Sequence, residues 1–256
     1  MYEIKTDTHT HTIFSGHAYS TIEENVRAAK EAGMEALGIT DHFSRLFVPD
    51  TSFCHYGNFG NFKALPKEWY GVRLFCGAEA DIVDVEGHLF GYDLELPFAF
   101  REPKPTYQEW LTGGSDYLIA SVHDKSFTFG QSLVKTTELY CKALEQPKVL
   151  ILGHIGRAGV PFDLDEVIKA AREQHKMIEI NEASFGYPEQ IRSLCQKIAE
   201  RCAELGTMIS LGSDAHSSFY VGKFEQAKAM LEKIHFPEEL IGTRNLESLT
   251  ELVGRL

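Results

Sequence analysis

Residues 3–11 read EIKTDTHTH, an extended segment that ends in two histidines spaced two positions apart. Because side chains alternate across a strand, His9 and His11 project to the same side of an extended backbone. On a helix the two side chains would diverge by about 200°, so the pair can chelate an ion only if the segment is a strand. The stretch therefore predicts a strand whose carboxyl end carries two metal ligands.

Seven segments of strand length recur along the chain and alternate with segments of helical periodicity. They are rich in Ile, Leu and Val and are bounded by Gly or charged residues, as is typical of buried strands in a parallel sheet. The expected strands span residues 3–9, 36–42, 72–81, 117–123, 149–154, 177–181 and 208–214. This order predicts an α/β fold.

The helices between the strands carry start and stop signals. Ser20 and Glu23 have the spacing of a capping box, which predicts a helix over residues 21–32. Gly33 stands where a left-handed residue would end that helix. A later helix is expected to begin at Asp163.

One domain is expected over residues 1–256, because no repeat, low-complexity tract or linker interrupts the pattern. The long stretches that are predicted to be irregular are residues 43–71 and 82–114. The first stretch is rich in aromatic side chains, which could line a substrate mouth but are more often used to pack a loop against the rim of a sheet.

Composition argues against several classes of partner. The net charge is −12 and the chain has no long Lys/Arg run, so neither a long nucleic acid nor an anionic membrane is expected to bind. No segment approaches the roughly 18 apolar residues that span a bilayer, and residues 1–12 lack the pattern of a signal peptide. The five cysteines include no CxxC pair, which predicts reduced thiols and, with the rest, a cytoplasmic location.

Metal-competent side chains recur where the predicted strands end. In parallel α/β folds the carboxyl ends of the strands share one edge, and sites are built there. We therefore expect one rim to hold nine candidate ligands: His9, His11, His17, His42, Glu79, His123, His154, Asp214 and His216. The remaining histidines have no convergent neighbours in the sequence pattern and are not expected to take part: His55, His88, His175 and His235.

Each candidate has a simpler explanation when it is taken alone. An isolated buried histidine is more often a hydrogen-bonded core residue than a ligand, and a lone glutamate in a strand can face solvent. These simpler explanations do not suit the nine candidates taken together, because burying clustered carboxylates and imidazoles costs free energy unless a cation lies among them. A closed zinc site takes about four protein ligands, so nine predict two or three ions, with Glu79 bridging two of them.

The expected chemistry is hydrolysis of a phosphate ester. Closely spaced divalent ions lower the pKa of a shared water and hold the attacking and leaving oxygens in line. A phosphate ester matches them well, since its transition state needs charge neutralisation more than covalent help. Arg45, Lys125 and Arg157 follow three of the ligands in the sequence and are predicted to form a phosphate clamp that binds substrate.

These residues form an ordered series of motifs that covers nearly the whole chain. The series is Asp7-x-His9-x-His11, His17-Ala18-Tyr19-Ser20-Thr21, Ile39-Thr40-Asp41-His42, Gly77-x-Glu79, His123, Gly153-His154, Ile180-Asn181 and Gly212-Ser213-Asp214-x-His216. It resembles the PHP (polymerase and histidinol phosphatase) phosphoesterases, most closely their small stand-alone bacterial members with three zinc ions. The resemblance implies a distorted (β/α)7 barrel, similar to a TIM barrel but one strand short.

The resemblance also implies a metal assignment. The first ion would be held by His9, His11, Glu79 and Asp214, the second by Glu79, His123 and His154, and the third by His17, His42 and His216. Zinc is usual in such relatives, and manganese or iron occupies similar sites. Glu79 and Asp214 are the expected catalytic carboxylates.

The motifs do not specify the substrate. After His154 the chain reads IGRAG, so the substrate-contacting basic residues of histidinol phosphatases have no residue-by-residue counterpart. The leading hypothesis is a metal-dependent phosphomonoesterase for a small phosphorylated metabolite, a class that includes histidinol phosphatase.

Three other functions are compatible with parts of the pattern. A phosphodiesterase or short-oligonucleotide nuclease would use the same reaction type. A metal-dependent amidohydrolase also begins with H-x-H on a barrel strand, but it has no evident use for His17, His42 and His216. A non-enzymatic metal-storage or regulatory protein would hold coordinatively closed ions without an exchangeable water or anion.

Overall fold

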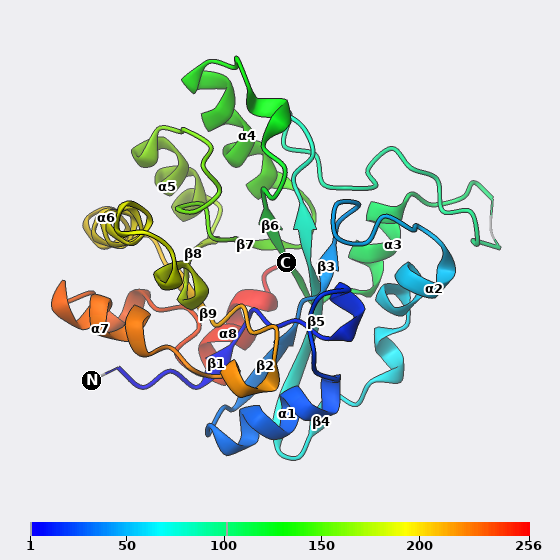
Figure 1. Ribbon diagram of the computed structural model, residues 1–256, viewed down its shortest axis with the longest axis horizontal. Coiled ribbons are helices and arrows are strands. Elements are labelled where there is room, and N and C mark those ends of the chain that lie inside the picture. Colours follow the sequence, from blue (N-terminus) through cyan, green and yellow to red (C-terminus); the bar gives the residue numbers. More distant parts are fainter. Residues whose placement is uncertain (1, 101) are drawn as a thin grey trace.

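The computed structural model describes residues 2–100 and 102–256 and shows a nearly closed barrel of strands surrounded by helices (Figure 1). Within these residues the sheet has nine strands: β1 (Thr6–Asp7), β2 (Ala36–Ile39), β3 (His42–Phe43), β4 (Glu68–Trp69), β5 (Val72–Asp81), β6 (Tyr117–Ser121), β7 (Val149–Leu152), β8 (Met177–Asn181) and β9 (Ile209–Gly212). Seven of them pair in parallel in the order β1-β2-β5-β6-β7-β8-β9. The predicted seven-stranded barrel is confirmed.

The barrel closes where the segments after β1 and β9 meet. The carbonyl oxygen of His9 accepts the amide of Asp214 at 2.8 Å. Asp7, which is fully buried in β1, accepts the amides of Ser213 and Gly222 at 3.0 and 2.9 Å. These bonds bring the H-x-H segment beside the segment that follows β9.

Strand β5 is long enough to pair with different neighbours along its two halves. Residues 73–76 pair with β2 and residues 77–81 pair with β6. Gly77 lies at the changeover, where a Cβ atom would stand 1.9 Å from the carbonyl oxygen of Tyr117, so only glycine permits this approach. The short strands β3 and β4 also pair with β5, and β3 sets His42 opposite Glu79.

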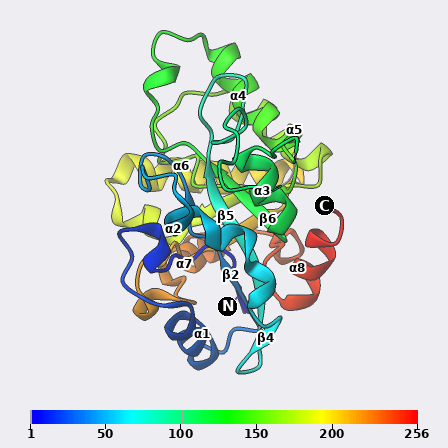
Figure 2. The ribbon, with the colours of Figure 1, turned by 90° about the vertical axis from the view of Figure 1, so that its right-hand side faces the viewer.

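Helices cover the outside of the sheet, with α4 to α7 in sequence on one side and α2 and α3 on the other (Figures 1 and 2). The α-helices of the described residues are α1 (Ile22–Glu31), α2 (Phe53–Tyr56), α3 (Tyr107–Gly114), α4 (Leu133–Glu145), α5 (Leu164–Glu173), α6 (Glu189–Leu205), α7 (Glu225–Lys233) and α8 (Leu246–Val253). Leu249 and Leu252 of α8 belong to the same buried cluster as Tyr117 and Met177, the first residues of β6 and β8. Because α8 fills the amino-terminal end of the barrel, the carboxyl end is the one left for a site.

Helix α1 begins one residue later than the sequence predicted. Its capping box joins Thr21 and Glu24, and the prediction that used Ser20 and Glu23 was wrong. The reason is tertiary, since Ser20 Oγ accepts the amide of Ser218 at 2.8 Å and so is committed to another segment.

The two stretches that were predicted to be irregular contain regular elements. Residues 43–71 include α2 and β4, and residues 82–114 end in α3. Thr106 and Glu109 form a capping box at the start of α3 that the sequence analysis did not recognise. The aromatic side chains of the first stretch largely serve packing, as the complete burial of Tyr56 illustrates.

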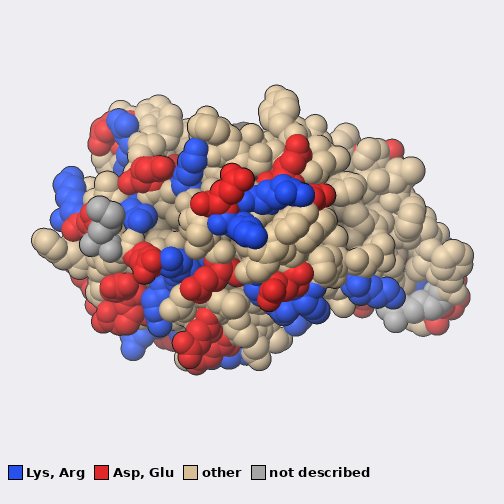
Figure 3. Space-filling view, turned by 90° about the horizontal axis from the view of Figure 1, so that it is seen from below, with Lys and Arg blue, Asp and Glu red and all other residues tan. Residues whose placement is uncertain are grey.

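The surface shown in Figure 3 intermixes positive and negative side chains. That face therefore offers no continuous basic strip for a nucleic-acid backbone. In the part of the chain that the structure describes, no helix combines the length and apolar character needed to cross a membrane.

Candidate metal centre

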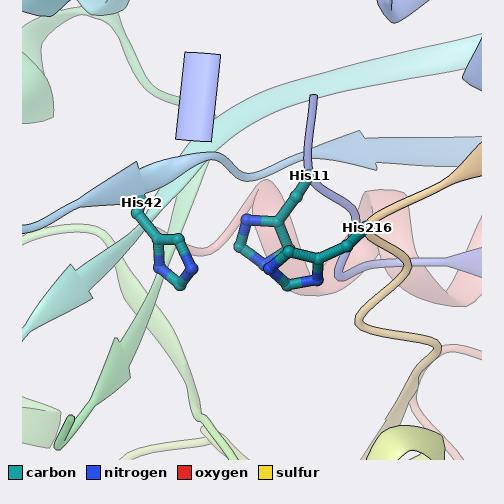
Figure 4. Close-up of side chains that lie close together, drawn as sticks. All are labelled: His11, His42 and His216. Carbon is teal, nitrogen blue, oxygen red and sulfur yellow. The ribbon is translucent and has the colours of Figure 1, made fainter. Parts of the chain in front are cut away.

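The carboxyl ends of the strands bring the predicted ligands together. His9 and His11 leave β1 side by side, with their Nε2 atoms 3.1 Å apart. Asp214 follows β9, and its Oδ1 atom lies 3.1 Å from Nε2 of His11. The rings of His11, His42 and His216 reach the same space from three separate segments (Figure 4).

Among the described residues, three groups of side chains offer ligand atoms within 4.8 Å of one another. The groups are His9, His11 and Glu79; His42, Glu79 and His123; and His11, His42 and His216. Spacings of this size suit ligands that each lie about 2 Å from a common ion. The groups share members, so the cluster is continuous rather than three isolated sites.

Glu79 lies at the centre of the cluster, with its two carboxylate oxygens directed to different histidines. Oε1 lies 2.6 Å from Nε2 of His154 and 3.3 Å from Nε2 of His123. Oε2 lies 3.0 Å from Nδ1 of His42 and 3.3 Å from Nε2 of His9. Burial favours a raised pKa for this carboxyl, but the surrounding imidazoles, led by His123, hold its pKa well below the usual value. Glu79 is therefore an anion in a position to bridge.

Hydrogen bonds orient five of the histidines in the same way. In each ring Nδ1 contacts an oxygen atom, which leaves Nε2 available for a ligand. The contacts are Glu179 for His9 (2.7 Å), Ser15 Oγ for His11 (2.9 Å), the Ser15 carbonyl for His17 (3.1 Å), Asp81 for His123 (2.6 Å) and the Asp214 carbonyl for His216 (2.9 Å). Metal-binding histidines are held in this manner, because the bond at one nitrogen fixes the tautomer at the other.

Several ligand atoms are buried without any hydrogen bond. Within the described chain they include both ring nitrogens of His42, Nδ1 of His154, Nε2 of His216 and Oε2 of Glu79. An unsatisfied buried polar atom costs about 1–3 kcal/mol, and divalent ions would satisfy Oε2 of Glu79, Nε2 of His216 and one ring nitrogen of His42. Imidazole nitrogen and carboxylate oxygen without thiolate form a donor set that zinc, manganese or iron accepts. The residues therefore fit a metal centre.

Two of the predicted ligands adopt backbone conformations that are unusual for residues other than glycine. The φ angles of His154 and Asp214 are +31° and +56°. The main-chain amides of both residues donate hydrogen bonds. The His154 amide donates to Glu179 Oε2 at 2.8 Å, and the Asp214 amide donates to the carbonyl oxygen of His9 at 2.8 Å. Strain of this kind persists where the surroundings over-determine it, and it is common at functional sites.

The histidines differ in how strongly they hold protons when no ion is bound. Burial lowers the pKa of His9, but the neighbouring carboxylates, led by Glu179, outweigh it and raise the pKa well above the usual value. The same opposition raises the pKa of His123 to about 10, with Glu79 as the main carboxylate. Burial instead holds the pKa of His11 well below its usual value. Because only a neutral imidazole binds metal, ions and protons compete for His9 and His123.

His17 approaches the cluster from the turn before α1, and its side chain is exposed. Its ring centroid lies 5.0 Å from that of His42 and 4.5 Å from that of His216. The three residues assigned to a third ion thus lie together, although the group within 4.8 Å has His11 in place of His17. The ring of Phe47 stacks on His42 at 4.2 Å and forms an apolar wall on this side.

The three predicted clamp residues lie in different surroundings. Arg157 is largely buried and donates from Nη2 to Asp214 Oδ2 at 2.5 Å and from Nη1 to Asn181 Oδ1 at 2.8 Å. Lys125 is exposed and its Nζ reaches a main-chain carbonyl 3.4 Å away. Arg45 is exposed and lines a cavity of about 310 Å³ that Asp81 also lines. The fold brings Arg157 into direct contact with a predicted ligand.

Comparison with known proteins agrees with this geometry. Residues 7–183 match the model of the family described as the PHP domain. The chain belongs to the PHP domain family. The resemblance inferred from the motifs is confirmed.

Curated relatives share most of their length with this PHP chain. It is 37% identical over 246 residues to a probable phosphatase of Caldanaerobacter subterraneus subsp. tengcongensis, covering 96% of this chain and 89% of the relative. It is 40% identical over 235 residues to a probable phosphatase of Clostridium botulinum, covering 92% and 88%.

A solved structure with the same fold is histidinol phosphate phosphatase of Lactococcus lactis, which was crystallised with zinc, L-histidinol and phosphate. The TM-score is 0.57 at 17% identity, and the match covers 91% of this chain and 94% of that one.

Supporting residues of the PHP site were missed in the sequence. Glu179 and Asp81 hold the Nδ1 atoms of two histidines, and Ser15 Oγ links His11 to Asp41, to which it donates at 2.6 Å. The available signal was an acidic residue within an otherwise apolar strand, as in MIEIN of β8. That signal alone does not say which neighbour the carboxylate meets.

Proposed function

We propose that the protein is a metal-dependent phosphomonoesterase that hydrolyses a small phosphorylated metabolite at a centre of three divalent ions, with zinc as the expected ion. The observation that carries the proposal is the central position of Glu79, whose two oxygens face different sets of histidines at 2.6–3.3 Å. A buried anion in this arrangement suits a bridge between ions.

The class of enzyme, a phosphoesterase hydrolase, follows from the family and the curated relatives. The zinc and phosphate that accompany the Lactococcus lactis structure support zinc as the ion and a phosphate group as the part of the substrate that binds. The proposed ligand sets are the three given by the family resemblance, with Glu79 shared between the first two.

The chain supplies positioning and charge for the reaction. Bound divalent ions would provide a water of lowered pKa and neutralise the phosphoryl oxygens. Glu79 can hold two ions through separate oxygens, and Asp214 is kept ionised because His9, His11 and Arg157 outweigh the effect of burial and hold its pKa well below the usual value. Hydrolysis adds water across the P–O bond and releases an alcohol and inorganic phosphate.

A cavity of about 420 Å³ lies beside the site and suits the alcohol part of a small substrate. Asp214 and His216 form one wall. The 3-10 helix η5 (Glu182–Gly186) and the start of α7 contribute other walls. Its size supports a metabolite rather than a polymer as the substrate.

The purified protein is expected to release phosphate from an aryl phosphate only when zinc, manganese or iron has been restored to it. A bis-aryl phosphate should be hydrolysed more slowly, and the reverse order would favour the phosphodiesterase alternative. Fully loaded protein that turns over no member of a phosphometabolite panel, histidinol phosphate included, would contradict the proposal.

Arg157 is expected to bind the phosphate group of the substrate. The Arg157→Ala variant should raise KM for an aryl phosphate about 10- to 100-fold, because a charge-assisted hydrogen bond of about 1.5–3 kcal/mol is lost. Metal content per chain is the control, since Arg157 also contacts Asp214. An unchanged KM with full metal content would exclude the clamp role.

A further inference from the structure

We propose that Glu179 is a positioning residue that sets two histidines, His9 and His154, for metal binding from a strand to which no ligand has been assigned. The inference rests on the proposed function only in taking these histidines as ligands. Its readout is metal binding, so it can be tested separately from phosphatase activity.

Both oxygens of Glu179 are used, and the side chain is completely buried. Oε1 accepts from Nδ1 of His9 at 2.7 Å, so Nε2 of that ring is the nitrogen directed to the cluster. Oε2 accepts from the main-chain amide of His154 at 2.8 Å. One carboxylate on β8 thereby links the segments that follow β1 and β7.

The hydrogen bond from the His154 amide to Glu179 lies at a residue with an unfavourable backbone conformation. His154 has a φ angle of +31°, a conformation that a residue with a Cβ atom adopts at a cost. The amide bond to Glu179 helps to hold this conformation and, with it, the ring whose Nε2 lies 2.6 Å from Glu79.

Asn181, two residues further along β8, extends the network. Its Nδ2 donates to Glu179 Oε2 at 3.2 Å and to Asp214 Oδ2 at 3.3 Å. Its Oδ1 accepts from Arg157. Residues on the same face of β8 therefore also contact a predicted carboxylate ligand.

The position of the Glu179 carboxylate depends on the glycine at residue 212. A Cβ atom on Gly212 of β9 would stand 2.3 Å from Glu179 Oε1 and 2.6 Å from Cβ of His9. The absence of a side chain at Gly212 is thus what allows the carboxylate and the His9 ring to meet. The glycine of the Gly-Ser-Asp motif is explained by this contact.

A purely structural role for Glu179 does not explain why three negatively charged carboxylates are buried around one histidine. Glu179, Glu79 and Asp214 are buried carboxylates around His9, which lies within 3.6 Å of each of them. Repulsion and desolvation of three such groups are offset when cations lie among them. A carboxylate on the far side of a ligand imidazole also increases the basicity of that imidazole.

The test is the Glu179→Gln variant. An amide has one acceptor oxygen, but His9 Nδ1 and the His154 amide are both donors, so one of them must face the NH2 group. The zinc dissociation constant of the most affected site should rise about 10- to 100-fold, measured by competition with a chelator. Sites that use neither histidine should keep their affinity.

The matched control is Asp116→Asn. Asp116 lies just before β6, at the opposite end of that strand from His123, and accepts the main-chain amide of Cys76 at 2.8 Å. Its zinc affinity should equal that of the parent protein. If Glu179→Gln also keeps the parental affinity, or if both variants lose it equally, the inference is overturned.

Two further measurements keep the inference testable if the variant is unstable. A lower Tm of metal-free Glu179→Gln with unchanged zinc affinity would mean a structural role only. In the zinc-loaded parent, a long-range ¹H–¹⁵N spectrum should show His9 protonated at Nδ1, and a proton at Nε2 would reject the assignment. Zinc binding that is weakened in a protein without phosphatase activity would uphold the role of Glu179 and reject the proposed function.

Discussion

The Glu79→Ala variant is expected to lose two ions per chain and to lower kcat/KM for an aryl phosphate on the order of 10³-fold. The reason is geometric, since the oxygens of Glu79 face His154 and His123 on one side and His42 and His9 on the other. Without the carboxylate, both sets of imidazoles lose their shared anion. Metal analysis after gel filtration and steady-state kinetics measure the two effects.

His216→Ala is the matched control for that experiment. His216 belongs to one group of ligand atoms only and makes its Nδ1 bond to a main-chain carbonyl. It should therefore lose a single ion and retain the two that Glu79 bridges. Equal metal losses in the two variants would contradict the proposed ligand sets.

Removal of the ions is expected to abolish phosphate release and to make thermal stability fall as the pH rises from 7 to 10. In the metal-free protein, burial opposes protonation of His123, but Glu79 and the hydrogen bond to Asp81 raise its pKa to about 10. A raised pKa means that the charged form is favoured by folding. That contribution is complete below the unfolded value near 6.5 and is lost as the pH passes through about 10.

The metal-loaded protein should behave differently, because a ligand histidine is already neutral. The difference in Tm between loaded and metal-free protein should therefore widen over this pH range, as differential scanning calorimetry can measure. Zinc binding at pH 7.5 should release protons from His9 and His123, which calorimetric titration in two buffers of different ionisation enthalpy detects. Parallel Tm curves and no proton release would contradict the assignment of these two residues.

At acidic pH the stability of the metal-free protein is expected to change with pH in the opposite direction. The pKa of Glu79 and that of Asp214 lie well below their usual values because the surrounding cations outweigh burial. Their contribution to the stability of the metal-free protein is present above the unfolded values near 4 and is lost as the pH falls through the lower folded values.

Some local features of the fold could be predicted from the sequence, and others could not. The cap at Asp163 is where it was predicted, with its side chain accepting the amide of Glu166. The box at Thr21 was displaced by one residue, because the choice between two adjacent hydroxyls depends on Ser218, almost 200 residues away. Helix α3 was missed because it is short and ends in two glycines, although its capping box has the usual spacing.

The three basic residues show more clearly what the sequence does not determine. The sequence pattern does not distinguish them, because each follows a predicted ligand in the chain: Arg45, Lys125 and Arg157. The loops after β3, β6 and β7 fold differently, so that Arg157 meets Asp214 while the other two side chains are exposed. Sequence adjacency to a ligand does not fix the direction of a long side chain.

The sequence by itself determined the seven strands and the common rim of the nine candidate ligands, because side chains at the carboxyl ends of parallel strands share one edge whatever the details of packing. Only the tertiary structure decided which ring nitrogen faces the cluster and which carboxylate supports it. Glu179 illustrates the difference, since its partners lie on segments that the closure of β1 against β9 and the glycine at 212 bring within reach. Contacts between residues far apart in the chain follow from how the barrel closes, and no local pattern encodes them.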